Sequence, residues 1–357
     1  GDYRTPVQFG AHLSGIVIRP SSPAIVIEAP WIFNGASDVV VQSATLSDVE
    51  IAGGSNLTIR DSLVRGHVHL SGGSGHQLVG NQVRAVDEDA IVISGTLTSV
   101  RIDGNRISSD RRAMVVATNA ELDVSDNWID GGQTGIVIES SFGGHIRQNT
   151  ITSQTLGVDL QHAGDLSANV IRGSLTGIRI APLSGSLTLG DLPGQTPNIV
   201  RDNNLGIQLV NGNVVRQQVE RNVVGIAGVG TIGGGDISHA NAIAHNAMGT
   251  DVSGRVQFNR FNDNDVAIRI HSKSLVDHNL IITGDASVSA PVGILASGAR
   301  DAVIVQNTID ARTGDAVRLT DGAREIEVRG NILSAESGTA LHIADDSQSG
   351  FFSDYNQ

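Results

Sequence analysis

Two groups of polar residues carry side chains that could transfer protons or bind a carboxylate. The first group combines acids, an amide, an imidazole and a guanidinium: Glu139, Asp159, Gln161, His162 and Arg179. The second group is Arg269, His271 and Lys273, with Asp263 and Asp265 shortly before it. A cation beside a carboxylate neutralises it and acidifies the neighbouring C–H bond. Both groups therefore contain candidate catalytic residues.

A structural role explains the same residues. Acids and arginines on adjacent strands commonly form cross-strand pairs that add about a few tenths of a kcal/mol each and keep a long sheet soluble. We favour this interpretation over catalysis, and the sequence leaves open whether the protein is an enzyme. Equivalent outward positions supply three candidate substrate-binding residues, Gln161, Gln208 and Arg318.

An acidic run forms the first candidate metal cluster. The oxygens of Asp87, Glu88 and Asp89 could gather calcium, which prefers oxygen ligands. Arg111 and Arg112 would lie one repeat further on and compete for the same carboxylates. We favour the ion pairs and predict no cofactor, with calcium as the alternative.

Two histidines form the second candidate metal cluster. His67 and His69 are two residues apart, so in a strand they share one face. Imidazoles on one face could begin a metal site, but the sequence indicates no third ligand. We therefore predict exposed histidines here.

The elements that position these residues follow from internal repeats. Asparagines recur within groups at intervals of about 20 to 24 residues: Asn81, Asn105, Asn127, Asn149, Asn169, Asn259, Asn279, Asn307 and Asn331. Short phrases such as "GIVI", "GIRI" and "AIRI" follow most of them and alternate apolar with polar residues. Alternation of apolar and polar residues with a period of two predicts β-strands that have one buried face. Strands this close, without a crossover helix, predict a solenoid of parallel strands.

The repeated Asn has a physical interpretation. A sharp bend between strands needs a residue that tolerates left-handed backbone angles, and Asn tolerates them best among residues other than glycine. Stacked coils would place each Asn above the last, so that the amides hydrogen-bond along the stack. We therefore predict an asparagine ladder.

This pattern resembles the right-handed parallel β-helix, the pectin-lyase-like fold, over essentially the whole chain. Two stretches, "LTLGDLPGQTPNIVRDNNLGIQLVNG" and "IGGGDISHANAIAHNAMGTDVSG", resemble repeats of large secreted or surface-attached bacterial proteins, in which "IGG" precedes "N-x-I-x-x-N". In pectin-lyase-like enzymes the substrate groove runs along the outer face of the "GIxI" strand. The resemblance therefore implies that both polar groups lie on that face.

A shorter phrase resembles one enzyme family within this fold. The "SKS" around Lys273 is similar to the Lys-Ser phrase of chondroitinase B and related alginate lyases. That family has an arginine at the end of the next coil's strand, where this chain has Ala296 and Ser297. The chain also lacks the signature phrases of polygalacturonases, pectate lyases and mannuronan epimerases.

Composition limits the remaining classes. The chain has 357 residues, 43 Gly, no Cys, 3% aromatic residues and a formal charge of -13, which together favour an all-β, turn-rich protein. Scattered basic residues argue against a nucleic-acid partner. No stretch approaches the roughly 20 apolar residues that a membrane span needs.

We predict an all-β, single-stranded right-handed parallel β-helix of about 13 to 14 coils at residues 35–344. Capping segments are expected at residues 1–34 and 345–357, with Phe351, Phe352 and Tyr355 covering the second end.

The favoured function is a non-catalytic module of a larger bacterial protein, extracellular or at the cell surface, that serves as a spacer, in adhesion or in glycan contact. Its expected partners are a polysaccharide or cell-surface glycan and neighbouring domains. The alternative is a lyase, epimerase or hydrolase acting on an acidic glycan. A face of mutually paired charges would favour the module, and unpaired charges converging in a groove would favour the enzyme.

Overall fold

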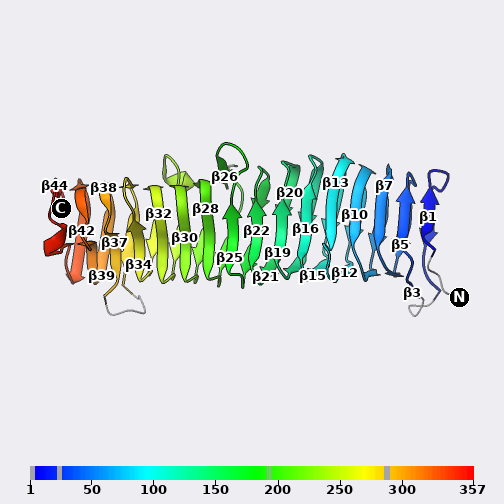
Figure 1. Ribbon diagram of the computed structural model, residues 1–357, viewed down its shortest axis with the longest axis horizontal. Coiled ribbons are helices and arrows are strands. Elements are labelled where there is room, and N and C mark those ends of the chain that lie inside the picture. Colours follow the sequence, from blue (N-terminus) through cyan, green and yellow to red (C-terminus); the bar gives the residue numbers. More distant parts are fainter. Residues whose placement is uncertain (1–4, 22–25, 191, 193, 285–289) are drawn as a thin grey trace. The chain divides into compact units, whose positions relative to one another are not determined.

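The computed structural model describes residues 5–21, 26–190, 192, 194–284 and 290–357. The chain divides into two compact units, residues 1–174 and 175–357. Within each unit, short strands pair in parallel with their equivalents in the preceding and following coils (Figure 1). Each unit is therefore a parallel β-solenoid.

Each coil of the first unit contributes one strand to each of three sheets. Sheet A contains β1 (Val7–Gly10), β4 (Trp31–Asn34), β7 (Val49–Ser55), β10 (Val68–Ser74), β13 (Ile91–Leu97), β16 (Arg112–Ala117), β19 (Thr134–Ile138) and β22 (Leu156–Leu160). Sheet B contains β2 (Val17–Ile18), β5 (Val40–Gln42), β8 (Thr58–Arg60), β11 (His76–Val79), β14 (Ser99–Asp103), β17 (Glu121–Ser125), β20 (Gly143–Arg147) and β23 (Asp165–Ser167). Sheet C contains β3 (Val26–Ile27), β6 (Thr45–Leu46), β9 (Leu63–Val64), β12 (Gln82–Ala85), β15 (Arg106–Ser109), β18 (Trp128–Gly131), β21 (Thr150–Ser153) and β24 (Val170–Arg172).

The second unit is also wound from parallel strands, three of which are long enough to span two files. One file of strands is β25 (Thr176–Ile180), β28 (Leu205–Val214), β30 (Val224–Ile232), β32 (Met248–Gln257), β34 (Val266–Ile270), β37 (Val292–Ser297), β40 (Asp315–Thr320) and β43 (Leu341–Ile343). The long strands β28, β30 and β32 extend into a second file, where β28 pairs with β26 (Leu187–Leu189) and β32 with β35 (Leu275–Asp277). This file continues from β35 through β38 (Arg300–Val305), β41 (Arg324–Arg329) and β44 (Phe352–Asp354). The last file is β27 (Ile199–Arg201), β29 (Gln218–Glu220), β31 (Ala242–Ala244), β33 (Arg260–Asn262), β36 (Leu280–Thr283), β39 (Thr308–Thr313) and β42 (Ile332–Ser337). Two short 3-10 turns, η1 (Ile237–His239) and η2 (Asp345–Ser347), complete the elements.

The core lies inside the coils and consists of stacked aliphatic files. Ile93, Val116, Ile138 and Leu160 are in register on β13, β16, β19 and β22, and all are buried. Each such side chain stabilises the fold by about 1.5–3 kcal/mol through removal of apolar area from water. The period-two prediction is confirmed.

The predicted asparagine ladder is also confirmed. In the first unit the Nδ2 of Asn105 donates to the Oδ1 of Asn127 at 2.9 Å, and Asn127 donates to Asn149 at 2.9 Å. The same Nδ2 of Asn127 contacts the carbonyl oxygens of Ile102 at 2.9 Å and Ser125 at 2.8 Å. The buried amides therefore satisfy backbone groups that the bend removes from the strand ladders.

The predicted reason for the asparagines was wrong. Left-handed backbone angles belong to the residue before the ladder Asn: φ is 56° at Asp126 and 58° at Gln148, and Asn127 and Asn149 do not share this conformation. The residue before Asn makes the turn, and the Asn side chain then points into the bend. Asparagine is therefore used for its amide and not for its backbone tolerance.

The second unit contains two ladders. One continues the expected type and consists of Asn198, Gln217, Asn241, Asn259, Asn279, Asn307, Asn331 and Asn356. The other lies five residues further along the chain and consists of Asn203, Asn222, Asn246 and Asn264. The two ladders bound the three-residue strands β27, β29, β31 and β33. The second ladder was not predicted, although both Asn of the "N-x-I-x-x-N" phrase are its signal.

The described strands make more coils than predicted. Sheet-C strands number eight in the first unit and seven in the second, 15 together, against the 13 to 14 coils expected. Part of the difference arises because β1, within the expected capping segment 1–34, already pairs with β4. At the other end β44 pairs with β41, and the side chains of Phe352 and Tyr355 are 53% and 82% exposed. These two rings do not form the expected apolar cover.

Candidate functional site

The outward charges of sheet A in the first unit pair with one another. Arg112 donates to Asp89 through Nε at 2.9 Å and through Nη2 at 2.5 Å, and to Glu139 through Nη1 at 3.0 Å. The hydrogen bond to Asp89 raises the pKa of the Arg112 guanidinium, against an opposing effect of burial. The predicted ion pair between the acidic run and the next coil is confirmed for Asp89. Asp87 is exposed, with φ of 60°.

The other members of the first predicted group are divided between the two units. Asp159 is buried on β22, and its Oδ2 accepts a hydrogen bond from Gln161 Nε2 at 2.8 Å. His162 follows and is half-buried. Arg179 lies on β25 of the second unit, in register with Gln208 on β28. Within the first unit, Asp159 and Gln161 come together, whereas Glu139 is paired with Arg112.

The second predicted group gathers around an acid that the sequence analysis did not include. Asp251 on β32 is in register with Arg269 on β34. Its Oδ1 lies 2.5 Å from His271 Nε2, and its Oδ2 lies 4.0 Å from Arg269 Nη1. Arg269 Nε is buried and has no hydrogen-bond partner among the described residues. Lys273 is exposed, with φ of 62°.

Arg318, a predicted substrate-binding residue, is also paired. Its Nε donates to Asp315 Oδ2 at 2.6 Å. Asp315 in turn accepts a hydrogen bond from the backbone N–H of Thr339 at 2.9 Å. The guanidinium of Arg318 is therefore fixed along its own strand β40.

His67 lies within a ring of carboxylates at the start of β10. Its Nδ1 is 3.0 Å from Glu88 Oε2 and 3.3 Å from Asp48 Oδ1, and its Nε2 is 2.7 Å from Glu50 Oε1. Burial lowers the pKa of His67, but the hydrogen bond with Glu50 and the charges of Asp48 and Glu88 outweigh it, so the pKa is raised. The other oxygen of Glu50 lies 3.0 Å from His69 Nδ1. The prediction of simply exposed histidines was wrong for His67, because strand register brings acids from three coils around it.

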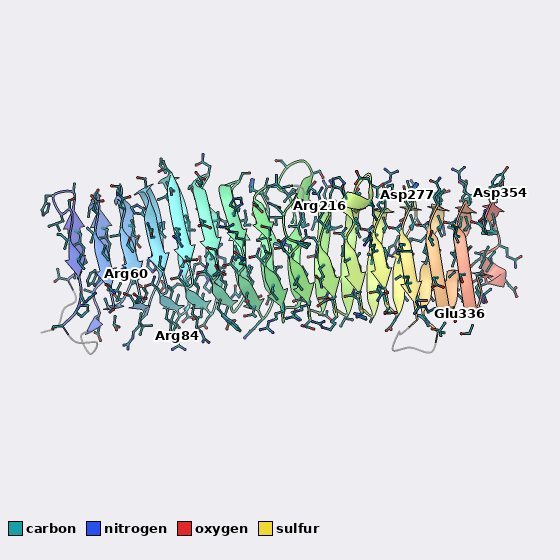
Figure 2. All side chains as sticks on the ribbon, turned by 180° about the vertical axis from the view of Figure 1, so that it is seen from behind. Arg60, Arg84, Arg216, Asp277, Glu336 and Asp354 are labelled. Carbon is teal, nitrogen blue, oxygen red and sulfur yellow. The ribbon has the colours of Figure 1, made fainter. Side chains whose placement is uncertain are left out.

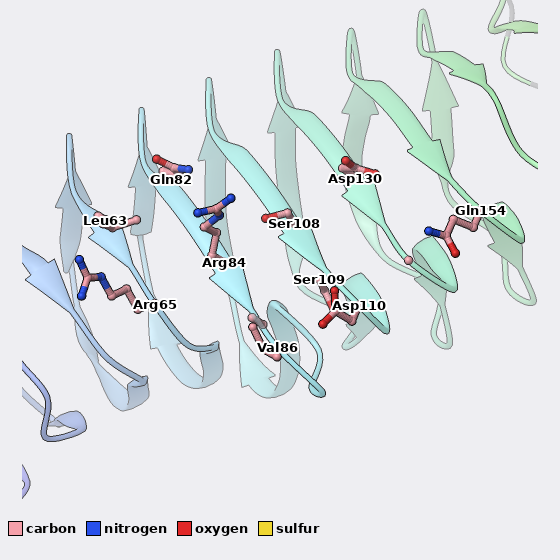
Figure 3. Close-up of a pocket in the computed structure, with 12 residues that line it drawn as sticks. Leu63, Arg65, Gln82, Arg84, Val86, Ser108, Ser109, Asp110, Asp130 and Gln154 are labelled. Atoms are coloured by element: carbon pink, nitrogen blue, oxygen red, sulfur yellow. The ribbon is translucent and has the colours of Figure 1, made fainter.

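A groove of about 670 Å³ follows the outer face of sheet C in the first unit (Figure 3). Its lining residues come from five successive coils: Leu63, Arg65, Gln82, Arg84, Ala85, Val86, Ser108, Ser109, Asp110, Asp130, Gly132 and Gln154. Arg84, Ser108 and Asp130 form one file, because β12, β15 and β18 pair in register. Figure 2 shows Arg84 at the outer margin of this unit.

Most of the long polar side chains of this groove are unpaired, in contrast to the charged side chains of sheet A; Asp130, by comparison, accepts a hydrogen bond from Thr152 at 3.2 Å. Within the described part of the chain, Arg65, Gln82, Arg84, Asp110 and Gln154 are exposed and make no side-chain hydrogen bond or ion pair. Figure 3 shows them along the same face as Ser108 and Asp130. They are free to bind a polar ligand.

An exposed aromatic ring lies beside the groove. Trp128 is 43% exposed on β18, two residues before Asp130 and therefore on the same face of the strand. The guanidinium carbon of Arg172 lies 5.8 Å from the ring centroid, which is a cation–π geometry. The ring is therefore held in place and presents apolar surface next to polar groups.

Sequence reasoning missed this groove although its signal was present. The residue two places after a ladder Asn points inward, as Val83 follows Asn81, so Gln82 and Arg84 must point outward. The resemblance to pectin-lyase-like enzymes directed attention to the other face.

Comparison with known proteins agrees with the architecture. Residues 14–176 match the family described as the right-handed beta helix region. No curated protein matches the chain. A solved structure, a mannuronic acid-specific polysaccharide family 6 lyase from human gut microbiota, shares 13% identity and covers 98% of this chain and 86% of that chain, with a TM-score of 0.31.

The parallel pairing of equivalent strands defines the class of protein, a parallel β-solenoid, and residues 14–176 of it match the right-handed beta helix family model. The prediction of a parallel β-helix is confirmed. The similarity to the lyase supports no conclusion about a reaction or a substrate of this chain. The described residues contain no helix that is long and apolar enough to cross a membrane.

Proposed function

We propose that this chain is a non-catalytic β-helix module that contacts an acidic glycan through the groove on sheet C of its first unit. The observation that supports this proposal is the contrast between the outer faces of sheet A and sheet C in the first unit. Charges on sheet A are paired, as Arg112 is with Asp89 and Glu139. In the groove, five polar side chains have no partner among the described residues: Arg65, Gln82, Arg84, Asp110 and Gln154. On sheet A, the face where a catalytic groove was expected, the mutually paired charges favour the module over the enzyme. The unpaired side chains lie on a different face, sheet C, where they are exposed and suit ligand binding.

The chemistry of the groove fits a chain of sugar acids. Arg65 and Arg84 carry guanidinium forks that match a carboxylate in bidentate geometry. Gln82, Gln154 and Asp110 can exchange hydrogen bonds with hydroxyl groups. At about 4.8 Å per coil, the five contributing coils extend over roughly 19 Å, which suits an elongated ligand.

Trp128 supplies the apolar part of the same surface. A sugar ring has one or both faces lined by C–H groups, and these pack on an aromatic face while the hydroxyls stay in water. Because Trp128 and Asp130 share a strand face, one ligand could contact both the ring and the groove.

The wider context is part of the same proposal. We place the module outside the cell or at the cell surface, among neighbouring domains of a larger protein. The support is the resemblance of residues 187–212 and 232–254 to repeats of such proteins and the lack of cysteine.

The test is binding of polymannuronate, polygalacturonate and hyaluronan by isothermal titration calorimetry, with neutral dextran as the comparison. A charge-assisted hydrogen bond contributes about 1.5–3 kcal/mol, so Arg84→Ala should weaken binding by at least tenfold, and Arg65→Ala similarly. Arg60→Ala, which removes the same charge from sheet B, should leave the affinity unchanged. Equal affinity of the Arg65→Ala/Arg84→Ala variant and the wild type would refute the role of the groove.

A polysaccharide-active enzyme is the second candidate, favoured by the buried, unsatisfied Nε of Arg269 beside Asp251 and His271. Incubation with the same uronate polymers should then produce absorbance from unsaturated sugars. Loss of that signal in Arg269→Ala or Arg179→Ala would establish catalysis and overturn the non-catalytic part of the proposal.

A further inference from the structure

We propose that Asp48, His67 and Glu88 form a binding site for a divalent first-row transition metal, with Zn²⁺ as the reference ion. The three residues come from three successive coils at the edge of sheet A in the first unit. One ligand atom of each lies within 4.8 Å of the other two. This site is independent of the glycan groove on sheet C.

The distances fit coordination. Ligands that hold Zn²⁺ at about 2.0–2.2 Å in a tetrahedron lie about 3.3–3.6 Å from one another. His67 Nδ1 lies 3.0 Å from Glu88 Oε2 and 3.3 Å from Asp48 Oδ1. A small shift of the Glu88 side chain, away from Nδ1 by about 0.3 Å or more and toward Asp48, would therefore bring all three atoms into range.

The number of acceptors also favours an ion. The two carboxylate oxygens accept only, and Nδ1 can offer them a single proton to share. A divalent ion can bind both oxygens and the nitrogen lone pair together. The mixed set of one imidazole and two carboxylates suits a borderline ion better than calcium, which takes six to eight oxygen ligands.

Glu50 completes the arrangement from behind the histidine. Its Oε1 lies 2.7 Å from His67 Nε2, the nitrogen on the far side of the ring from Asp48 and Glu88. Metal-binding histidines usually donate their second N–H to a carboxylate, which fixes the ring and the tautomer. Glu50 is held in turn by His69 Nδ1 at 3.0 Å, and His69 Nε2 lies 2.8 Å from Ser94 Oγ. Glu50 is therefore a positioning residue.

Asp48 is held in place by the backbone of the next coil. Its Oδ1 accepts the backbone N–H of His67 at 3.2 Å. A Cβ at Gly66 would lie 1.9 Å from the same oxygen, so only glycine leaves room for the carboxylate there. The His67 side chain is 24% exposed, which leaves a side open for water or a further ligand to complete the coordination.

The experiment is calorimetric titration of the chelator-treated full chain with ZnCl₂ and separately with CaCl₂. We expect saturable 1:1 binding of Zn²⁺ and a raised melting temperature at saturation. His67→Ala should weaken this binding by at least 100-fold. Glu50→Gln should weaken it by about 10- to 100-fold, as loss of an outer carboxylate does.

Controls separate this site from other histidines and from misfolding. His342→Ala, which removes an exposed histidine from the second unit, should leave Zn²⁺ affinity unchanged. Glu88→Gln is the second ligand variant, because its side chain is 40% exposed and its loss should not unfold the chain. Zn²⁺ binding that is absent in the wild type, unaffected by His67→Ala or Glu88→Gln, or weaker than Ca²⁺ binding would overturn the proposal.

Discussion

Replacement of Asn127 by alanine tests the physical account of the fold most directly. Asn127 is 2% exposed. Its Nδ2 donates to Ile102 O, Ser125 O and Asn149 Oδ1, and its Oδ1 accepts from the backbone N–H and the Nδ2 of Asn105. The two N–H hydrogens are shared among three acceptors and the oxygen accepts two hydrogen bonds, so four full hydrogen bonds at about 1 kcal/mol net each bound the loss near 4 kcal/mol. We expect a loss of about 2 to 4 kcal/mol, because water entering the gap recovers part of it.

The assay is urea unfolding followed by tryptophan fluorescence. Trp31 and Trp128 are the only tryptophans, and both lie in the first unit, so the signal reports on the unit that contains Asn127. Asn119→Ala is the matched control, because Asn119 is exposed and outside the ladder, and it should change stability by less than about 0.5 kcal/mol. If Asn127→Ala were as mild as the control, buried amide stacking would not hold the coils together.

Three further changes test other parts of the structure. His76 is buried, with its Nε2 3.0 Å from Gly72 O, and burial lowers the pKa of the imidazole from the ordinary 6.5. The unfolded chain therefore binds more protons than the folded one, so the stability should fall as the pH drops below about 6.5. Urea midpoints compared across pH should show a smaller fall for His76→Gln than for the wild type. Gly144→Ala should lower the unfolding midpoint strongly, because φ is 78° and the new Cβ would lie 2.1 Å from Leu122 O. Gly104→Ala is the control: its new Cβ meets no atom within 4 Å, so it should cost only about 1 kcal/mol of backbone strain. Arg112→Ala should cost about 1–3 kcal/mol in the same urea assay, because Asp89, whose side chain is only 13% exposed, would lose its partner; an unchanged midpoint would show that the pair contributes nothing.

The architecture was predictable because its signals are local. Alternation in phrases such as 178–180, where Ile178 and Ile180 are buried and Arg179 is not, reports which side chains face the core, and repeated Asn reports where each coil bends. The backbone conformation at that bend was not predictable in the same way. The left-handed position falls on Asp126, Gln148 and other types of residue, so no single amino acid marks it.

The candidate sites were less predictable, because they depend on contacts between coils. Asp48 and Glu88 meet His67 from 19 and 21 residues away, and those separations follow the lengths of individual coils. Asp251 was missed beside Arg269 for the same reason. Residue types indicate which chemistry is available, but only the register decides which side chains meet.

The ladder also bears on how such a chain can change its length. In the first unit, each of Asn105, Asn127 and Asn149 donates a side-chain hydrogen bond to the amide oxygen of the next rung, always in the same direction along the stack. The segment between rungs varies from 18 residues, between Asn241 and Asn259, to 28 residues, between Asn279 and Asn307. Duplication or deletion of one complete coil would therefore leave the same hydrogen bond between the two rungs that it brings together. The fold can thus tolerate a change in the number of coils.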